Sequence, residues 1–125
     1  SNMKFLNQIQ NRLSQLCETN GDAPWVERIV LTDEVVATLI CMPPGNSSRR
    51  HYHPDNDEFW IVMGGTLVWE IEGEEPIQAG EGDIMRVPKG KAHNIVTVGD
   101  RASLRLAIGI PDIPHIDSTT GEVFN

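Results

Sequence analysis

The sequence predicts an all-β protein, a sandwich or barrel of short strands, with one short helix at its N-terminal end. Eleven glycines and eight prolines in 125 residues favour frequent turns over long helices. Turn residues also separate short apolar runs about every eight to twelve residues, as in sandwiches and barrels. A chain of this length forms one domain with a real core. We expect an N-terminal helical segment (3–24), a β-barrel domain (25–111) and a C-terminal tail (112–125).

The N-terminal segment has helical spacing. Its apolar residues recur at steps of three and four, with polar residues between them: Phe5, Ile9, Leu13 and Leu16. This pattern predicts one amphipathic helix of about three turns that the Asn20-Gly21 pair ends. We expect the helix to pack as a lid on the outside of the main body.

The main body is predicted to consist of strands. Their expected ranges are 25–31, 34–42, 58–63, 66–71, 84–87, 93–98 and 102–110. Gly64-Gly65 is predicted to form a hairpin turn that requires positive φ. The tail after Pro111 lacks periodicity, so three alternatives stay open: it wraps its own domain, wraps a partner subunit, or is partly disordered.

Charge and cysteine content exclude some classes of function. A formal charge of −8 argues against nucleic acid and anionic membranes as partners. Cys17 and Cys41 follow no disulfide or metal pattern, so we expect free, partly buried thiols. No long apolar run is present, and a cytoplasmic location is expected.

Four side chains form a predicted metal site. His51 and His53 project together because alternate strand residues face the same way. Glu58 follows the corner at 54–57, and His93 follows a turn at 88–91 of another hairpin. Three imidazoles and one carboxylate suit one divalent transition metal: Fe, Mn, Ni, Zn, Co or Cu. Four protein ligands leave coordination positions open, which is typical of catalytic sites.

Two spaced motifs contain these ligands. The first, G-x5-H-x-H-x4-E-x6-G, runs from Gly45 to Gly65, and the second, G-x5-P-x-G-x2-H, runs from Gly82 to His93. Together they resemble the paired motifs of the cupin superfamily, in particular small single-domain cupins of the cupin 2 type. The resemblance implies a double-stranded β-helix (jelly-roll) barrel and assigns metal binding to the four ligands. Thr97 stands where the family often has an asparagine that is usually not a ligand, so the metal prediction is unaffected but no subfamily follows.

Strand alternation suggests substrate contacts. If Glu58 faces inward, Trp60 and Val62 do too, and Arg49 shares the face of His51 and His53. Arg86 is either a solvent residue or a carboxylate anchor in the cavity. The candidate substrate-binding residues are therefore Arg49, Trp60 and Arg86.

The basic residues near the motifs allow a further interpretation. Half of the ten lie beside the ligands: Arg49, Arg50, Arg86, Lys89 and Lys91. They would give a positive mouth for an acidic substrate, unless the acidic residues of the same stretches cancel it.

Two further expectations concern the C-terminal third. The alternating run Leu104, Leu106, Ile108 and Ile110 is predicted to be barrel core, with Arg105 turned the other way. His115 lies outside the motifs and is expected to be an ordinary surface residue.

The strand at 58–63 is apolar on both faces, so both must be covered. The N-terminal helix could cover one of them, and a second subunit is the stronger candidate. We therefore expect a homodimer.

Three functions fit these features. The first is a metal-dependent oxidoreductase, resembling the cupin dioxygenases, that acts on a small polar or acidic molecule. The second is an isomerase or lyase that uses the metal as a Lewis acid. The third is a non-catalytic module that binds a metal or a small ligand. No general base is evident outside the metal ligands, and no catalytic residue is assigned.

Overall fold

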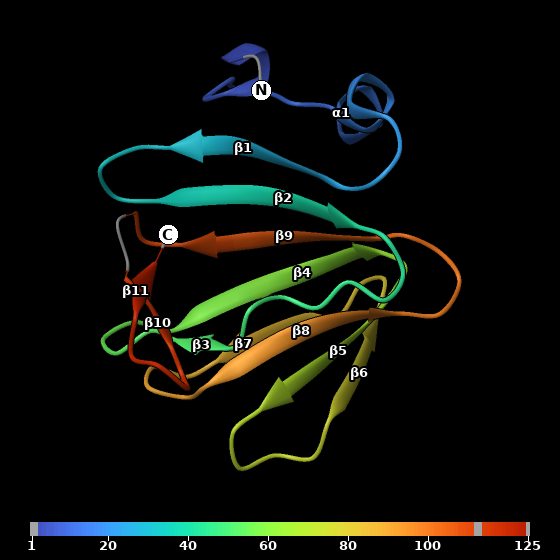
Figure 1. Cartoon of the computed structure of the whole chain (residues 1–125). Coiled ribbons are helices and arrows are strands. Elements are labelled where there is room, and N and C mark those ends of the chain that lie inside the picture. Colours follow the sequence, from blue (N-terminus) through green and yellow to red (C-terminus); the bar gives the residue numbers. More distant parts are fainter. Residues whose placement is uncertain (1–2, 112–113, 125) are drawn as a thin grey trace.

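The computed structural model describes residues 3–111 and 114–124, and its strands form two antiparallel sheets that face each other (Figure 1). Sheet A has the order β1 (Trp25–Leu31), β2 (Val36–Met42), β9 (Ser103–Gly109), β4 (Glu58–Gly64) and β7 (Ile84–Val87). Sheet B has the order β11 (Val123–Phe124), β10 (His115–Asp117), β3 (His51–Tyr52), β8 (His93–Val98), β5 (Thr66–Ile71) and β6 (Ile77–Gly80). The predicted all-β class is confirmed.

The main core lies between the two sheets. It contains inward-facing residues of both: Trp60, Val62, Leu67, Trp69, Ile71, Ala79, Val87 and Ile95. The rings of Trp60 and Trp69 meet edge to face, with centroids 5.5 Å apart, a favoured aromatic geometry. The predicted inward orientation of Trp60 and Val62 is confirmed, since both are buried.

The predicted hairpin at Gly64-Gly65 is wrong. β4 pairs with β7 and β9 in sheet A, whereas β5 pairs with β6 and β8 in sheet B, so the chain crosses between sheets at this point. Gly65 has a φ of 72°, as predicted, and a Cβ there would lie 2.5 Å from the carbonyl oxygen of Ala102. Glycine is therefore needed for the backbone conformation and for the close approach of the 102–103 backbone.

The N-terminal helix is shorter than predicted. A 3₁₀ turn, η1 (Met3–Phe5), precedes α1 (Leu13–Asn20), and the chain between them is not helical. Asn7 interrupts the pattern with a φ of 57°. Its side-chain amide donates to the carbonyl oxygen of Leu31 at 2.9 Å and accepts from the N–H of Leu31 at 2.8 Å. Binding to the edge of β1 thus replaces the first turns of the helix.

The N-terminal segment nevertheless covers the outside of the barrel, as predicted. Phe5 and Leu16 pack with Leu39 of β2 in a second core cluster, on the face of sheet A opposite the main core. Gly21 ends α1 with a φ of 71°, and its N–H donates to the carbonyl oxygen of Cys17 at 2.9 Å.

The C-terminal tail wraps its own domain over residues 114–124. β10 pairs with β3, with Ile116 opposite Tyr52 and Asp117 opposite His51, and β11 pairs with β10. This hairpin lies at the end of the barrel where β4 begins (Figure 1). Residues 112, 113 and 125 of the predicted tail lie outside the described residues.

The two cysteines form no disulfide. Cys17 and Cys41 are free and partly buried, as predicted. Within residues 3–111 and 114–124, no helix has the length and apolar character needed to cross a membrane.

Candidate metal centre

The four predicted ligands converge at one end of the barrel. His51 of β3 is the cross-strand partner of His93 of β8, so the two imidazoles arrive side by side. His53 follows β3, and Glu58 is the first residue of β4 in the opposite sheet. One ligand atom from each of the four residues lies within 4.8 Å of the others. The group could therefore hold a metal ion.

Backbone carbonyls orient all three imidazoles. The Nδ1 atoms lie at hydrogen-bonding distance from the carbonyl oxygens of Arg49 (2.7 Å, His51), Pro114 (3.1 Å, His53) and Lys91 (3.0 Å, His93). A carbonyl oxygen can only accept, so each Nδ1 carries the hydrogen. In the neutral imidazole this leaves a lone pair on Nε2, as in histidines that bind metals.

Two of the Nε2 atoms lie close to the Glu58 carboxylate. Oε1 of Glu58 lies 2.9 Å from Nε2 of His53 and 3.6 Å from Nε2 of His93. Burial by itself raises the pKa of Glu58, but its contacts with the two histidines lower that pKa to about 2. A carboxylate and a nitrogen lone pair facing each other at 2.9 Å require a cation between them, either a proton on His53 or a metal ion.

His93 gives the clearest sign that the site fits a metal. Its Nε2 atom is buried, and among the described residues it has no hydrogen-bond partner. A buried nitrogen lone pair without a partner is costly, and coordination to a cation would satisfy it. His51 fits as well, because burial lowers its pKa to about 4 and so keeps it neutral at pH 7.

Metal affinity is expected to fall on acidification. Burial lowers the pKa of His53, but the hydrogen bond and charge of Glu58 outweigh this and hold the pKa above its usual value. A proton on His53 therefore competes with the metal, and the apparent Kd for zinc should rise about tenfold per pH unit below that pKa. Calorimetry at pH 6 in buffers of different ionisation enthalpy should show proton release on zinc binding. An affinity that is constant between pH 6 and pH 8 would contradict this assignment.

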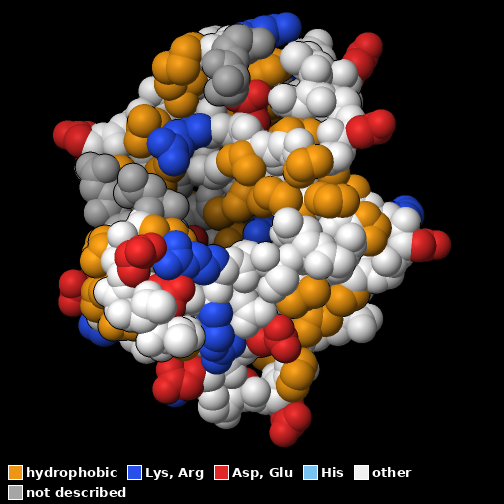
Figure 2. All heavy atoms as spheres, in the orientation of Figure 1, with side chains coloured by type: hydrophobic (Ala, Val, Ile, Leu, Met, Phe, Trp, Pro, Cys, Tyr) orange, Lys and Arg blue, Asp and Glu red, His pale blue; other side chains and the backbone are white. Residues whose placement is uncertain are grey.

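A cavity of about 450 Å³ lies beside the site. It reaches two ligands, His53 and Glu58, and most of its other walls come from β1, β2, β9 and the following segment: Arg28, Leu31, Val36, Thr38, Ile40, Ala107, Gly109, Ile110, Pro111 and His115. Figure 2 shows hydrophobic side chains gathered around a hollow in the face that carries β2, β9 and β4. The cavity has room for a small molecule next to the ligands.

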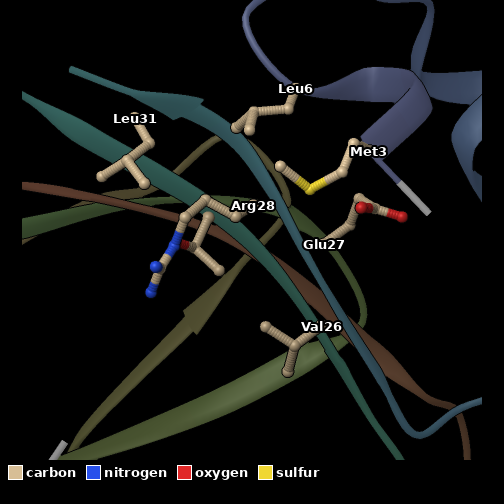
Figure 3. A pocket seen from close by; sticks show the side chains of 7 residues that line it. Met3, Leu6, Val26, Glu27, Arg28 and Leu31 are labelled. Carbon is tan, nitrogen blue, oxygen red and sulfur yellow. The ribbon is translucent and has the colours of Figure 1, made fainter. Parts of the chain in front are cut away.

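A second cavity, of about 330 Å³, lies away from the ligands at the edge of sheet A. Met3 and Leu6 extend over β1 there, near Val26, Arg28 and Leu31 (Figure 3). Among the described residues that line it, Glu27 alone is of a metal-ligating type, unlike the group of four beside the first cavity.

His115 is not the surface residue that the sequence predicts. Its ring centroid lies 4.5 Å from that of His53 and 4.9 Å from that of His51, and its side chain lines the larger cavity. The pairing of β10 with β3 brings it there. The tail sequence contains no periodic signal that identifies β10, so spacing arguments missed this residue.

The three candidate substrate contacts lie outside the lining of the larger cavity. The Arg49 side chain is 42% exposed and forms ion pairs of 2.8 Å with Asp117 and Glu122 of the C-terminal hairpin. Its expected inward orientation is wrong because β3 spans only two residues, so alternation cannot be extended back to position 49.

Arg86 and Trp60 also lie outside the cavity lining. Arg86 is 62% exposed and pairs with Asp57 at 2.7 Å, so the solvent alternative holds. Trp60 is 2% exposed and packs its ring between Trp69 and His93, with centroids 5.5 Å and 5.6 Å away. It is a core residue behind the site.

The expected orientation of β9 is inverted. Leu104 and Leu106 pack on the outer face of sheet A with Phe5, Leu16 and Leu39, which we call the N-terminal cluster. Arg105 is 4% exposed and lies inside the barrel. Arg105 lies between Ile40 of β2 and Val62 of β4, its cross-strand partners. Of the five basic residues that would form the positive mouth, Arg49 and Arg86 pair with acidic side chains, as the alternative of cancelled charge expects for these two.

A comparison with known families agrees with this fold and site. Residues 38–109 match the family model described as a cupin domain. This chain belongs to the cupin family, and its barrel is a double-stranded β-helix.

Curated proteins resemble part of this chain at moderate sequence identity. The chain is 31% identical over 87 residues to the polyketide synthase CurC of Streptomyces cyaneus, a match that covers 64% of this chain and 54% of CurC. The chain thus spans about half the length of the curated relatives that it resembles.

Solved structures of similar shape include a cupin-2 domain protein from Shewanella frigidimarina (TM-score 0.66, 21% identity, 87% of this chain and 99% of that one). Another is a cupin of double-stranded β-helix fold from Methanocaldococcus jannaschii (TM-score 0.66, 24% identity, 74% and 84%). At these identities the likeness establishes the fold alone.

Proposed function

We propose that this protein is a metal-dependent enzyme that acts on a small polar or acidic molecule. In this proposal His51, His53, Glu58 and His93 hold one divalent transition-metal ion. The observation that supports it best is their convergence at the end of a cavity, with each imidazole Nδ1 bonded to a backbone carbonyl. A bound metal of this kind supplies Lewis acidity and, for a redox-active ion, electron transfer.

The first candidate reaction is oxidation of the substrate by dioxygen, as in a dioxygenase. The three histidines and Glu58 would hold the ion, and four protein ligands would leave coordination positions for small molecules. Besides His53 and Glu58, the cavity is lined by apolar residues such as Leu31, Val36 and Ile40 and by the polar residues Arg28, Thr38 and His115. In this reaction Glu58 and the three histidines would bind the metal ion, and residues of the cavity wall would orient the substrate.

The second candidate is an isomerase or lyase reaction without oxygen. The position of His115 favours it, because this imidazole lines the cavity without belonging to the ligand set. It could accept or donate a proton at a substrate atom. The resemblance to CurC agrees with a substrate related to polyketides for either reaction.

One experiment separates these alternatives. Protein purified without chelators is loaded with Fe(II) under anaerobic conditions and mixed with 2-oxo acids, diols and phenols, and oxygen uptake is then recorded. Substrate-dependent uptake supports the oxidoreductase. Product formation in strict absence of oxygen supports the isomerase or lyase. A protein that binds one ion per chain but converts nothing under either condition is a binding module.

We also propose that the protein is a homodimer. Phe59 and Ile84 are exposed on the outer face of sheet A, beside the partly buried Ile61 and Ile108. The N-terminal cluster leaves this apolar group uncovered. Light scattering at micromolar concentration should give twice the chain mass of 13.9 kDa, and Phe59→Glu should give a monomer. A monomeric wild-type mass would refute the dimer.

A further inference from the structure

Arg105 is a buried charge inside the barrel. Arg105 is 4% exposed, and its side chain extends from β9 into the space between the sheets. Burial lowers the pKa of Arg105 to about 10, partly offset by the charge of Glu58, so the guanidinium stays positive at pH 7. Such a charge is costly in a protein interior unless a partner compensates it.

Within residues 3–111 and 114–124, no described ion pair or hydrogen bond engages two of the three guanidinium nitrogens of Arg105. Nε and Nη1 of Arg105 are both buried and have no hydrogen-bond partner there. The described ion pairs engage Arg49 and Arg86 but not Arg105. Two buried guanidinium nitrogens without acceptors are an unusual cost for a folded protein, and an anionic ligand would offset it.

The cavity lining lies on the same face of sheet A as Arg105, although Arg105 is not itself among the lining residues. Arg105 shares its face of β9 with Ala107 and Gly109, which both line the cavity, and its cross-strand partner Ile40 lines it too. Glu58, whose charge acts on Arg105, is both a metal ligand and part of the cavity wall. The positive group and the ligand set thus both adjoin residues that line one cavity.

We propose that Arg105 binds the carboxylate of a small organic acid in this cavity, with the rest of the molecule directed toward the metal ligands. One guanidinium balances one negative charge, which suits a carboxylate better than a dianionic phosphate, particularly near Glu58. Charge-assisted hydrogen bonds from a guanidinium to a carboxylate are short and strong. The position of the reactive end rests on the proposed function, but binding of the acid does not.

The test compares acids with their neutral amides. Binding of benzoate and benzamide, and of pyruvate and pyruvamide, is measured by calorimetry on zinc-loaded and on metal-free protein. Wild-type protein should bind each acid at least about tenfold more tightly than its amide, the ratio expected for one charge-assisted contact. This comparison needs no variant. An absence of preference, including an absence of measurable binding, would overturn the proposal.

Variants locate the contact. Arg105→Met should weaken acid binding about tenfold or more and leave amide binding unchanged, and Arg105→Lys should lie between the two. Arg86→Met is the matched control, because it removes the same charge from an exposed site, and it should bind acids like wild type. Equal acid binding by Arg105→Met and wild type would assign the contact to another group.

Stability distinguishes ligand binding from a structural role. Without ligand, Arg105→Met should melt at the same temperature as wild type or higher, because it removes an uncompensated buried charge. A structural arginine predicts a lower melting temperature with unchanged acid preference. If zinc fails to bind while the acid preference persists, the metal-dependent function is wrong and the Arg105 site stands. Loss of the preference in zinc-loaded protein rejects the Arg105 site alone.

Discussion

We expect zinc to raise the melting temperature of the wild-type protein, and replacing His93 with alanine is expected to abolish this rise. His93 contributes a buried Nε2 that has no hydrogen-bond partner among the described residues and lies 3.6 Å from Oε1 of Glu58, and its Nδ1 is fixed by the carbonyl oxygen of Lys91. Loss of a hydrogen bond that orients a metal ligand costs about 10- to 100-fold in metal affinity, so loss of a ligand itself should cost at least about 100-fold. Thermal melts over a zinc titration measure the effect.

The matched control is Lys91→Ala. This exposed neighbour supplies only its backbone carbonyl to His93, and that carbonyl remains after substitution. Its zinc response should equal that of wild type, and circular dichroism should show that both variants are folded. An unchanged zinc response in folded His93→Ala would remove His93 from the ligand set.

Replacing Trp60 with alanine is expected to lower the free energy of unfolding by about 3–5 kcal/mol, the cost of removing a large aromatic side chain from a core. Trp60 is 2% exposed and packs against Trp69 and His93. Trp60→Phe keeps part of this contact and should cost less. Urea denaturation of metal-free protein gives both values.

Ile77→Ala serves as the control, because Ile77 is exposed on the edge strand β6 and should change stability by about 0.5 kcal/mol or less. Trp60 was also a candidate substrate contact on sequence grounds, and that role has a different signature. Two results together would contradict a purely structural role for Trp60. Trp60→Phe would bind ligand more weakly than wild type, and Trp60→Ala would have an unfolding free energy close to that of wild type.

The group of four residues that could hold a metal was predictable because its spacing reflects local geometry. His51 and His53 are two residues apart and project together, and the motif glycines mark turns such as the crossing at Gly65. Most strands follow from their short alternating runs for the same reason. These features depend on residues that are close in the sequence.

Other features depend on contacts between distant segments. Alternation along β9 distinguishes two faces of the strand but does not show which face points into the barrel. The outer face is apolar as well, because the N-terminal segment packs on it. Arg105 was therefore assigned to the wrong side. His115 reaches the site through pairing of β10 with β3, which no local pattern in the tail predicts. Asn7 similarly shortened the helix by binding the edge of β1.

The most direct test of the account is the coordination of the bound metal, determined by X-ray absorption on protein loaded with one zinc ion per chain. We predict three imidazole nitrogens and one carboxylate oxygen from the protein around a single ion, with one nitrogen fewer in His93→Ala. A chain that retains no zinc, or a spectrum with fewer than two imidazoles, would contradict the central claim.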